Sequence, residues 1–313
     1  MLRFVLARLV AAVPTLAIVS IAVFLLIRLI PGDPAVLLLG DMADPTSLAE
    51  ARARLGLDQP LPMQFALWLG HVLAGDFGRS ITSGEAVLPL MLDRFQVSAG
   101  IVLTAVAGAT LVAVPLGMIA AWRQDRPLDL MLIGGATMLL SVPTFWLGLL
   151  MLLVFGVRLG WLPVVGYVAV SDDAGAGLLY LVLPIAALFL HEIGVLLRMA
   201  RASTIDVLRL DYIAHARAKG LSEGAMLTRH AFRNAFGPTW TLIGLVVGNL
   251  LAGIAVIEMV FTIPGLGRLL VDAIFARDYP VIQGCLLLIA AVYVVVNLIV
   301  DLCYPVFDPR VAA

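Results

Sequence analysis

Six long apolar segments alternate with polar ones along the chain, and each is long enough to cross a bilayer as a helix. A helix needs about 20 residues to span a hydrocarbon core of about 30 Å. Prolines fall inside some of these segments, which membrane helices tolerate because their neighbours satisfy the freed carbonyl groups. We therefore predict an all-α membrane protein with six spans, at 9–30, 97–121, 129–157, 178–198, 239–260 and 281–304.

The polar stretch 31–96 carries the signals of two short helices. Asp44-Pro45 is typical of a helix start, Gly56 is a plausible stop, and residues 60–73 place apolar side chains at helical spacing. A small helical lobe is therefore expected between the first and second spans.

Basic residues predict the orientation of the spans. The N-terminus, the 122–128 turn and the 199–238 loop are rich in Arg and Lys, whereas 31–96 has four arginines against eight acids. Because cytoplasmic loops carry the excess of Arg and Lys, we expect both termini and the 199–238 loop in the cytoplasm. The first apolar segment exceeds the roughly 7–15 residues of a signal-peptide core, so it is interpreted as a retained span.

Composition narrows the function classes. Hydrophobic residues make up 62% of the 313 residues and charged residues 13%, about half the charged share of a soluble domain. The net charge of −1 argues against a nucleic-acid binder. Neither the phosphate-binding pattern G-x-x-x-x-G-K-[ST] nor the zinc pattern H-E-x-x-H occurs. We therefore predict no catalytic residue, metal site or bound cofactor in this chain.

The stretch 201–238 is predicted to form a helix, a glycine turn and a second helix. Gly220 is placed where a left-handed residue ends a helix, and Ser222 can cap the next helix, which Gly237-Pro238 would end. An apolar stripe is expected on the first helix at Ile205, Leu208 and Tyr212.

Small and basic residues give this stretch the character of a docking surface. Ala216, Ala218 and Gly220 let another surface approach closely, and Arg217 and Lys219 can pair with acids on that surface. A helical knob held between two membrane helices is suited to receiving force from a soluble partner. A helix-turn-helix reader of DNA and a passive helix on lipid headgroups are the alternatives.

Four stretches, spread in order over nearly the whole chain, resemble one family. The run Asp211 to Leu221 resembles the EAA loop of binding-protein-dependent ABC importer permeases, and Arg229 to Ala235 matches the branch that handles dipeptides, oligopeptides and nickel. The other matches are Arg28 to Pro34, Leu55 to Pro60 with Gly75 to Ser80, and Glu258 to Pro280. His215 and the run Gly237-Pro238-Thr239 depart from the usual pattern and leave the docking contacts open.

The resemblance implies the type I ABC importer permease fold, with six transmembrane helices and an external helical lobe. The expected parts are a first helix at 1–30, the external lobe at 31–96, a five-helix domain at 97–306 and a cytoplasmic tail at 307–313. It also implies that a coupling helix within 205–225 docks into an ATPase. The coupling residues implied are Asp211, Tyr212, His215, Ala216, Arg217, Ala218, Lys219 and Gly220.

The partners follow from the same resemblance. The family works with a second permease, usually a different chain in this branch, two cytoplasmic ATPase subunits that hold ATP and Mg, and an external solute-binding protein. The expected location is the bacterial cytoplasmic (inner) membrane. The expected solute is a di- or oligopeptide, with a nickel complex or glutathione as alternative ligands.

Four polar residues in or near the predicted spans are candidates for the substrate pathway, because polar groups at membrane depth are costly. They are His191, Glu192, Asn249 and Glu258. The alternative for His191 and Glu192 is a structural role near the cytoplasmic end, and for Glu258 it is gating or anchoring of the loop at Pro264-Gly265.

Two functions of other classes remain open. A secondary transporter or channel would work without ATPases, and a membrane scaffold would move nothing. The first would need charged relays or inverted repeats in the membrane, and neither is clear in this sequence. The second has no need of a coupling loop.

Overall fold

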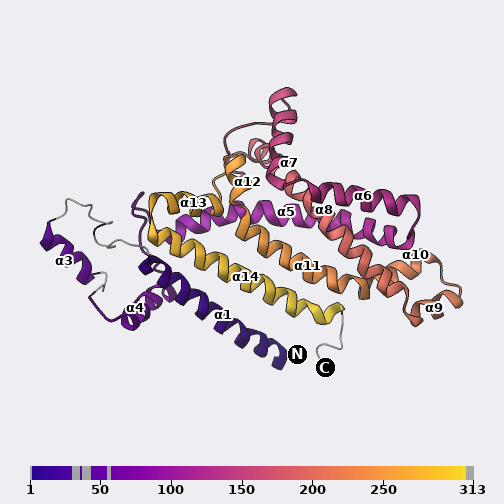
Figure 1. The fold of residues 1–313 in the computed structure, drawn as a ribbon, viewed down its shortest axis with the longest axis horizontal. Coiled ribbons are helices and arrows are strands. Elements are labelled where there is room, and N and C mark those ends of the chain that lie inside the picture. Colours follow the sequence, from indigo (N-terminus) through magenta and orange to yellow (C-terminus); the bar gives the residue numbers. More distant parts are fainter. Residues whose placement is uncertain (1, 30–35, 37–43, 55–57, 308–313) are drawn as a thin grey trace.

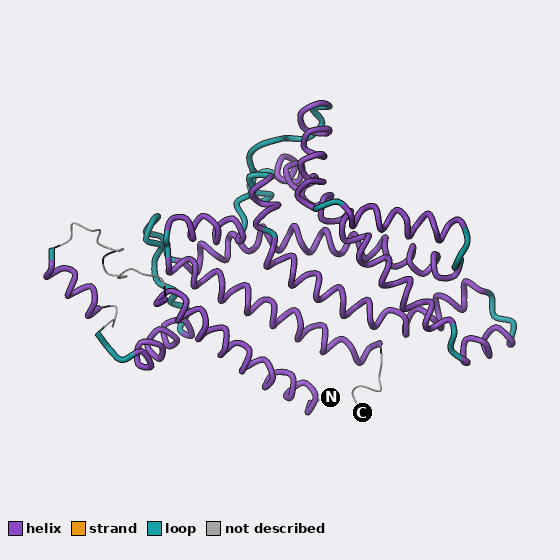
Figure 2. The backbone as a smooth tube through the Cα atoms, in the orientation of Figure 1, coloured by secondary structure: helices purple, strands orange, loops and turns teal. Residues whose placement is uncertain are grey.

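The computed structural model describes residues 2–29, 36, 44–54 and 58–307, and in these residues the chain is built of helices and loops (Figures 1 and 2). The helices are α1 (Leu2–Leu29), α3 (Pro45–Arg54), α4 (Leu61–Leu73), α5 (Val87–Trp122), α6 (Pro127–Ser141), α7 (Thr144–Met151), the π-helix η1 (Leu152–Arg158), α8 (Ala174–Leu208), α9 (Asp211–Ala218), α10 (Glu223–Ala225), the π-helix η2 (Met226–Ala231), α11 (Phe232–Gly253), α12 (Ala255–Val260), α13 (Leu266–Ala276) and α14 (Tyr279–Phe307).

Two long helices, α5 and α8, run along each other at the centre of the bundle (Figure 1). Small residues allow this approach: a Cβ atom on Gly117 would lie 2.7 Å from the carbonyl oxygen of Leu197. Close backbone contact through small residues is how membrane helices commonly pack. α6 and α11 pack against α8, α14 packs against α11, and α1 lies beside α14, where Arg8 and Asp301 form a 3.1 Å ion pair.

The predicted spans are confirmed in type, although their bounds differ. Among the described residues, five helices are long and apolar enough to cross a membrane, or six if the bent pair α6 and α7–η1 counts as one span. The second span begins at Val87 rather than at residue 97, and the fourth runs from Ala174 to Leu208. Helical continuity therefore extends well beyond the hydrophobic cores of these segments.

The third predicted span, 129–157, is wrong as a single helix. α6 ends at Ser141, and the helical pair starting at Thr144 is bent by 92° from it. Val142 is extended, with φ −97° and ψ 122°, because the ring of a following proline disfavours the helical conformation. Pro143, which has no N–H to donate to the preceding turn, comes directly before α7.

The two ends of the bundle differ in content. The start of α1, the end of α14, the turn between α5 and α6, and helices α9 and α10 lie toward one end, and α4 and α13 lie at the other (Figure 1). The two helices expected within 31–96 are present as α3 and α4, whereas the stop expected at Gly56 lies outside the described residues.

Candidate coupling and translocation site

A short helical elbow joins α8 to α11 at the end of the bundle that holds the start of α1 and the end of α14. We use "elbow" for residues 209–225, which contain α9, α10 and the turns beside them. Its underside packs into a cluster of buried side chains from α8, α9, η2 and α11. That cluster consists of Val207, Ile213, Met226, Leu227, Ala231 and Ala235. The elbow is therefore attached to two membrane helices at once.

The predicted stripe of Ile205, Leu208 and Tyr212 does not lie on one helix. α8 ends at Leu208, and α9 begins again at Asp211 after a turn, so the stripe is broken. Ile213, which is 0% exposed, faces the interior in its place. The implied coupling helix within 205–225 is accordingly three pieces: the last turn of α8, then α9, then α10.

The glycine turn is confirmed, and the predicted helix end at Gly237-Pro238 is wrong. Gly220 has a φ of +78°, a left-handed conformation that glycine adopts without steric cost. The Ser222 hydroxyl accepts a hydrogen bond from the Ala225 N–H and so caps α10. α11 continues through Pro238 to Gly253. At Gly237 the helix packs against Tyr304 and Phe307 of α14, which support α11 at this point.

The eight implied coupling residues lie together on α9 and the turn that follows it. Ala216 is buried, with 8% of its surface exposed, and the other seven are exposed. Arg217 pairs with Glu223 across the glycine turn at 3.0 Å. The Tyr212 hydroxyl accepts a 2.8 Å hydrogen bond from Asn234 and donates one of 3.3 Å to the His230 carbonyl. The first contact joins α9 to α10 within the elbow, and those of Tyr212 tie α9 to η2 and to the start of α11.

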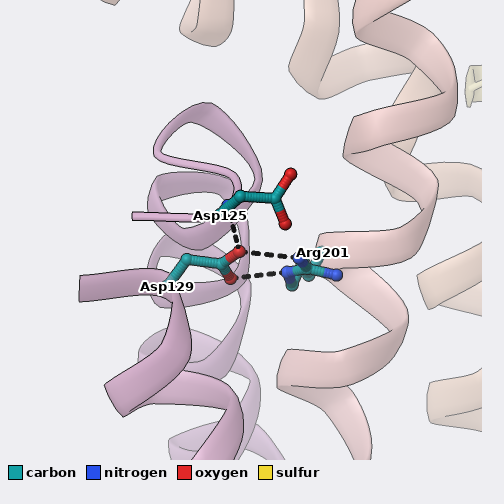
Figure 3. A network of polar contacts seen from close by, with 3 residues as sticks. All are labelled: Asp125, Asp129 and Arg201. Carbon is teal, nitrogen blue, oxygen red and sulfur yellow. Dashed lines mark hydrogen bonds and ion pairs between the residues drawn. The ribbon is translucent and has the colours of Figure 1, made fainter. Parts of the chain in front are cut away.

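An ion pair between a partly exposed arginine and a buried carboxylate, near the start of the elbow, is not predicted by the sequence patterns. Arg201 of α8 donates hydrogen bonds of 2.6 and 2.7 Å from Nε and Nη2 to the two carboxylate oxygens of Asp129 (Figure 3). The Asp125 N–H donates a further 2.9 Å bond to Asp129, whose residue is 1% exposed. One signal for this pair is present in the sequence: Asp129 is an acid at the start of an apolar segment, where an unpaired charge would be costly.

The four pathway candidates are not brought together. No hydrogen bond or ion pair in the described part of the chain joins any two of them. Glu192 is 4% exposed and its Oε2 atom has no hydrogen-bond partner among the described residues, and the same holds for Nδ1 of half-buried His191. Asn249 is exposed on α11. A role for these residues in the pathway stays a prediction.

Glu258 contacts a loop rather than an open space. Its carboxylate accepts a hydrogen bond from the Ser98 hydroxyl and a 2.7 Å bond from the Arg268 N–H in the first turn of α13. Ser98 in turn accepts a 2.8 Å bond from the Leu266 N–H. A Cβ atom on Gly265 would overlap the Glu258 carboxylate. The geometry favours anchoring of the Pro264-Gly265 loop, the alternative stated for this residue.

Two of the recognised motifs meet at a buried carboxylate. Asp278 Oδ2 accepts hydrogen bonds of 2.5 Å from the Ser80 hydroxyl and of 2.9 and 3.2 Å from the Thr82 hydroxyl and N–H. Burial raises the pKa of Asp278, but hydrogen bonds from Ser80, Ile81 and Thr82 outweigh it and hold the pKa below its usual value. The ionised side chain therefore ties the 76–86 loop to the start of α14.

A cleft of about 870 Å³ opens where α5 begins. Its walls come from the first turns of α5, the 167–171 segment and Pro264. Charges of both signs line it, and no ion pair joins them to other side chains in the described residues. Its charged and polar lining residues are Glu85, Asp93, Arg94, Gln96, Tyr167 and Ser171. Sites for small molecules commonly have volumes of about 300–1,000 Å³.

Comparisons with known proteins identify the family of this chain. The model described as "Binding-protein-dependent transport system inner membrane component" matches residues 113–313, and a model for the N-terminal part of such membrane components matches residues 1–104.

Three curated relatives are similar over nearly their full length. A protein of Brucella suis biovar 1 named as a peptide transport system permease is 42% identical over 99% of both chains. One of Sinorhizobium fredii named as a peptide ABC transporter permease is 41% identical over 98% of both. The glutathione transport system permease protein GsiC of Salmonella paratyphi A is 43% identical over 99% of both. The chain therefore belongs to the binding-protein-dependent transport system inner membrane components, the multi-pass permeases of ABC importers.

Proposed function

We propose that this chain forms half of the translocation pathway of an ATP-driven peptide importer and receives the ATPase stroke through the elbow. The observation that carries the proposal is the elbow's two-sided construction. Its outer face exposes seven of the eight implied coupling residues, and its underside is packed into α8 and α11. A push on α9 is therefore passed to two membrane-spanning helices.

A peptide solute fits the chemistry of the cleft. A free di- or oligopeptide carries an ammonium group at one end and a carboxylate at the other. Asp93 and Glu85 suit the first group and Arg94 suits the second, and all three line the same cleft. The names of the relatives support peptides and leave glutathione, itself a peptide, as an alternative ligand. A nickel complex remains an alternative only through the resemblance of the sequence motifs.

A second permease is proposed as the neighbour of α7 and η1. These helices stand away from the bundle at the 92° bend (Figure 1). Their exposed side chains are largely apolar, for example Phe145, Trp146, Leu149 and Val157, which are 44%, 48%, 46% and 60% exposed. An apolar arm of this kind is suited to wrapping around another membrane subunit.

The remaining partners follow from the division of labour in such importers. We propose that two ATPases bind ATP and Mg and dock on the elbow, that this chain itself is non-catalytic, and that an external binding protein delivers the solute near the cleft. This arrangement places both termini and the elbow in the cytoplasm, as the distribution of Arg and Lys predicts.

Substitution of Gly220 tests the proposal, because nothing lies within 4 Å of a Cβ atom built there. Asparagine tolerates a positive φ, so Gly220→Asn keeps the fold and adds bulk only toward the partner. Gly84→Asn is the matched control, since Gly84, in the loop before α5, has a φ of +73° and equally open surroundings.

Both variants are reconstituted in liposomes with the second permease, the ATPases and the external binding protein, and ATP-dependent uptake of radiolabelled trialanine is measured. We expect at least a tenfold loss for Gly220→Asn and normal uptake for Gly84→Asn. Normal uptake by Gly220→Asn and by Gly220→Asp would overturn the coupling role. Uptake by the chain alone, driven by an ion gradient without ATPases, would favour a secondary transporter instead.

A further inference from the structure

Helix α4 buries a polar side chain, and its exposed side chains are apolar except for His71, which pairs with Asp76 at the end of the helix. Gln64 is 8% exposed, whereas Met63, Leu67 and Leu73 are 52%, 49% and 80% exposed. Together with Ala66 and Gly70, which are also exposed, these three form one continuous stripe along the helix. A surface helix in water has the opposite arrangement, so the stripe calls for an apolar surrounding.

Contacts with α1 fix which side of α4 carries the stripe. Arg28 near the end of α1 donates hydrogen bonds of 3.0 and 2.8 Å from Nε and Nη2 to Gln64 Oε1. The Phe24 ring lies 5.2 Å from the Phe65 ring and 5.6 Å from the Trp68 ring. Because these groups occupy the inner side of α4, its apolar stripe faces away from the protein.

The position of Arg28 gives the depth of α4 in the membrane. A 19-residue apolar window, Arg8–Leu26, makes α1 a membrane span, and Arg28 lies two residues beyond it. The distance from Arg8 to Arg28 along a helix is about 30 Å, which equals the thickness of the hydrocarbon core. Arg28 therefore lies at the boundary with the headgroups, and so does the helix bonded to it. At 13 residues, α4 itself is too short to span.

We propose that α4 is an interfacial helix whose stripe of Met63, Ala66, Leu67, Gly70 and Leu73 lies in the lipid at the end of α1. We assign lipid as the surrounding of this stripe because the exposed apolar side chains of the membrane span α1 continue up to α4. Among them are Val13, Ile18, Leu25 and Leu26, which are 63%, 67%, 40% and 44% exposed. The Arg28–Gln64 contact joins α1 to α4 and thereby fixes the depth of the end of α1 in the bilayer.

A spin label on Leu67→Cys tests this assignment in the full chain reconstituted in phosphatidylcholine–phosphatidylglycerol liposomes. Cys303→Ala removes the partly exposed thiol, and Cys285 stays because it is 0% exposed. Power saturation with oxygen and with a water-soluble nickel chelate reports how deep each label lies. Leu103→Cys, 54% exposed in the middle of α5, is the lipid control, and Glu85→Cys in the cleft is the water control.

We expect the Leu67 label to be accessible to oxygen and at least threefold less accessible to the nickel chelate than the Glu85 label. The same result is expected at Met63→Cys, which serves as a second position if one label disturbs α4. A Leu67 label as accessible to the chelate as the Glu85 label would overturn the proposal, since it would lie in water. Low access to both reagents would also overturn it, since a protein surface would then cover α4.

Discussion

Arg201 and Asp129 face each other with two parallel hydrogen bonds, of 2.6 and 2.7 Å, between the guanidinium group and the carboxylate. Arg201 lies on α8 seven residues before its end at Leu208, and Asp129 lies in the first turn of α6. The pair thus joins the helix that leads into the elbow to the helix that leads to the bend and α7. If the elbow moves as proposed, this contact connects its movement to α7 and η1.

Asp129→Asn is expected to lower the free energy of unfolding by about 1–3 kcal/mol, because a charge-assisted bidentate contact is lost from a buried site. Differential scanning fluorimetry in detergent measures the change as a lower melting temperature. Arg201→Lys should also lower the melting temperature, because lysine lacks the planar guanidinium group that donates two hydrogen bonds to a carboxylate.

The exposed pair Arg217–Glu223 provides the control for this experiment. Its side chains are 54% and 39% exposed, so Glu223→Gln should cost at most about 1 kcal/mol. Equal melting temperatures for the Asp129 and Glu223 variants would contradict a structural role for the buried pair.

Gly265→Ala is expected to disrupt the turn between α12 and α13. The added methyl group would overlap the Glu258 carboxylate, which also accepts hydrogen bonds from Ser98 and from the Arg268 N–H. We expect lower yield of folded protein in size-exclusion chromatography and a loss of uptake. Gly253→Ala, at a position with nothing within 4 Å, should behave like the unmodified chain. Normal folding of Gly265→Ala would show that the loop repacks without cost.

Asp278→Asn is expected to release the 76–86 loop and to speed trypsin cleavage after exposed Arg79 at least threefold. Because hydrogen bonds hold the pKa of Asp278 below its usual value, its stabilising charge is present above the unfolded pKa of about 4 and is lost as the pH falls through the folded value. Protection of Arg79 in the unmodified chain should therefore be constant between pH 8 and pH 6. A protection that disappears within this range would contradict the lowered pKa.

Arg94→Gln is expected to raise the KM for uptake of uncapped trialanine about tenfold, because a charge-assisted hydrogen bond to the peptide carboxylate contributes roughly 1.5–3 kcal/mol. The KM for the amidated peptide should change little, which distinguishes binding of the carboxylate from a general disturbance of the cleft. Arg79→Gln, an exposed arginine that does not line the cleft, is the matched control. An equal effect of Arg94→Gln on both peptides would contradict the proposed contact.

The sequence predicts the number and type of spans well because lipid imposes a strict requirement for long apolar helices. It does not predict which proline breaks a helix. Pro115 and Pro184 lie inside continuous helices, whereas Pro143 lies in the break between α6 and α7. The difference lies in tertiary packing: α7 turns away to contact α12, where Gly148 accommodates the ring of Phe261. Contacts between distant segments are not visible in local periodicity.

The same limit applies to the candidate site. The elbow's glycine turn and cap can be predicted because Gly220 and Ser222 act locally. The ion pair of Arg201 with Asp129 joins residues 72 positions apart, and the contact of Ser98 with Glu258 joins residues 160 apart. Polar residues at membrane depth signal that partners exist, but the sequence alone does not say whether these are solutes or other side chains.

The bend after Ser141 has a consequence for the surrounding lipid. α6 has 15 residues, about 22 Å of helix, and so does not cross a bilayer of about 30 Å by itself. The bilayer beside α6 must therefore thin locally, or the helical pair that starts at Thr144 must complete the crossing.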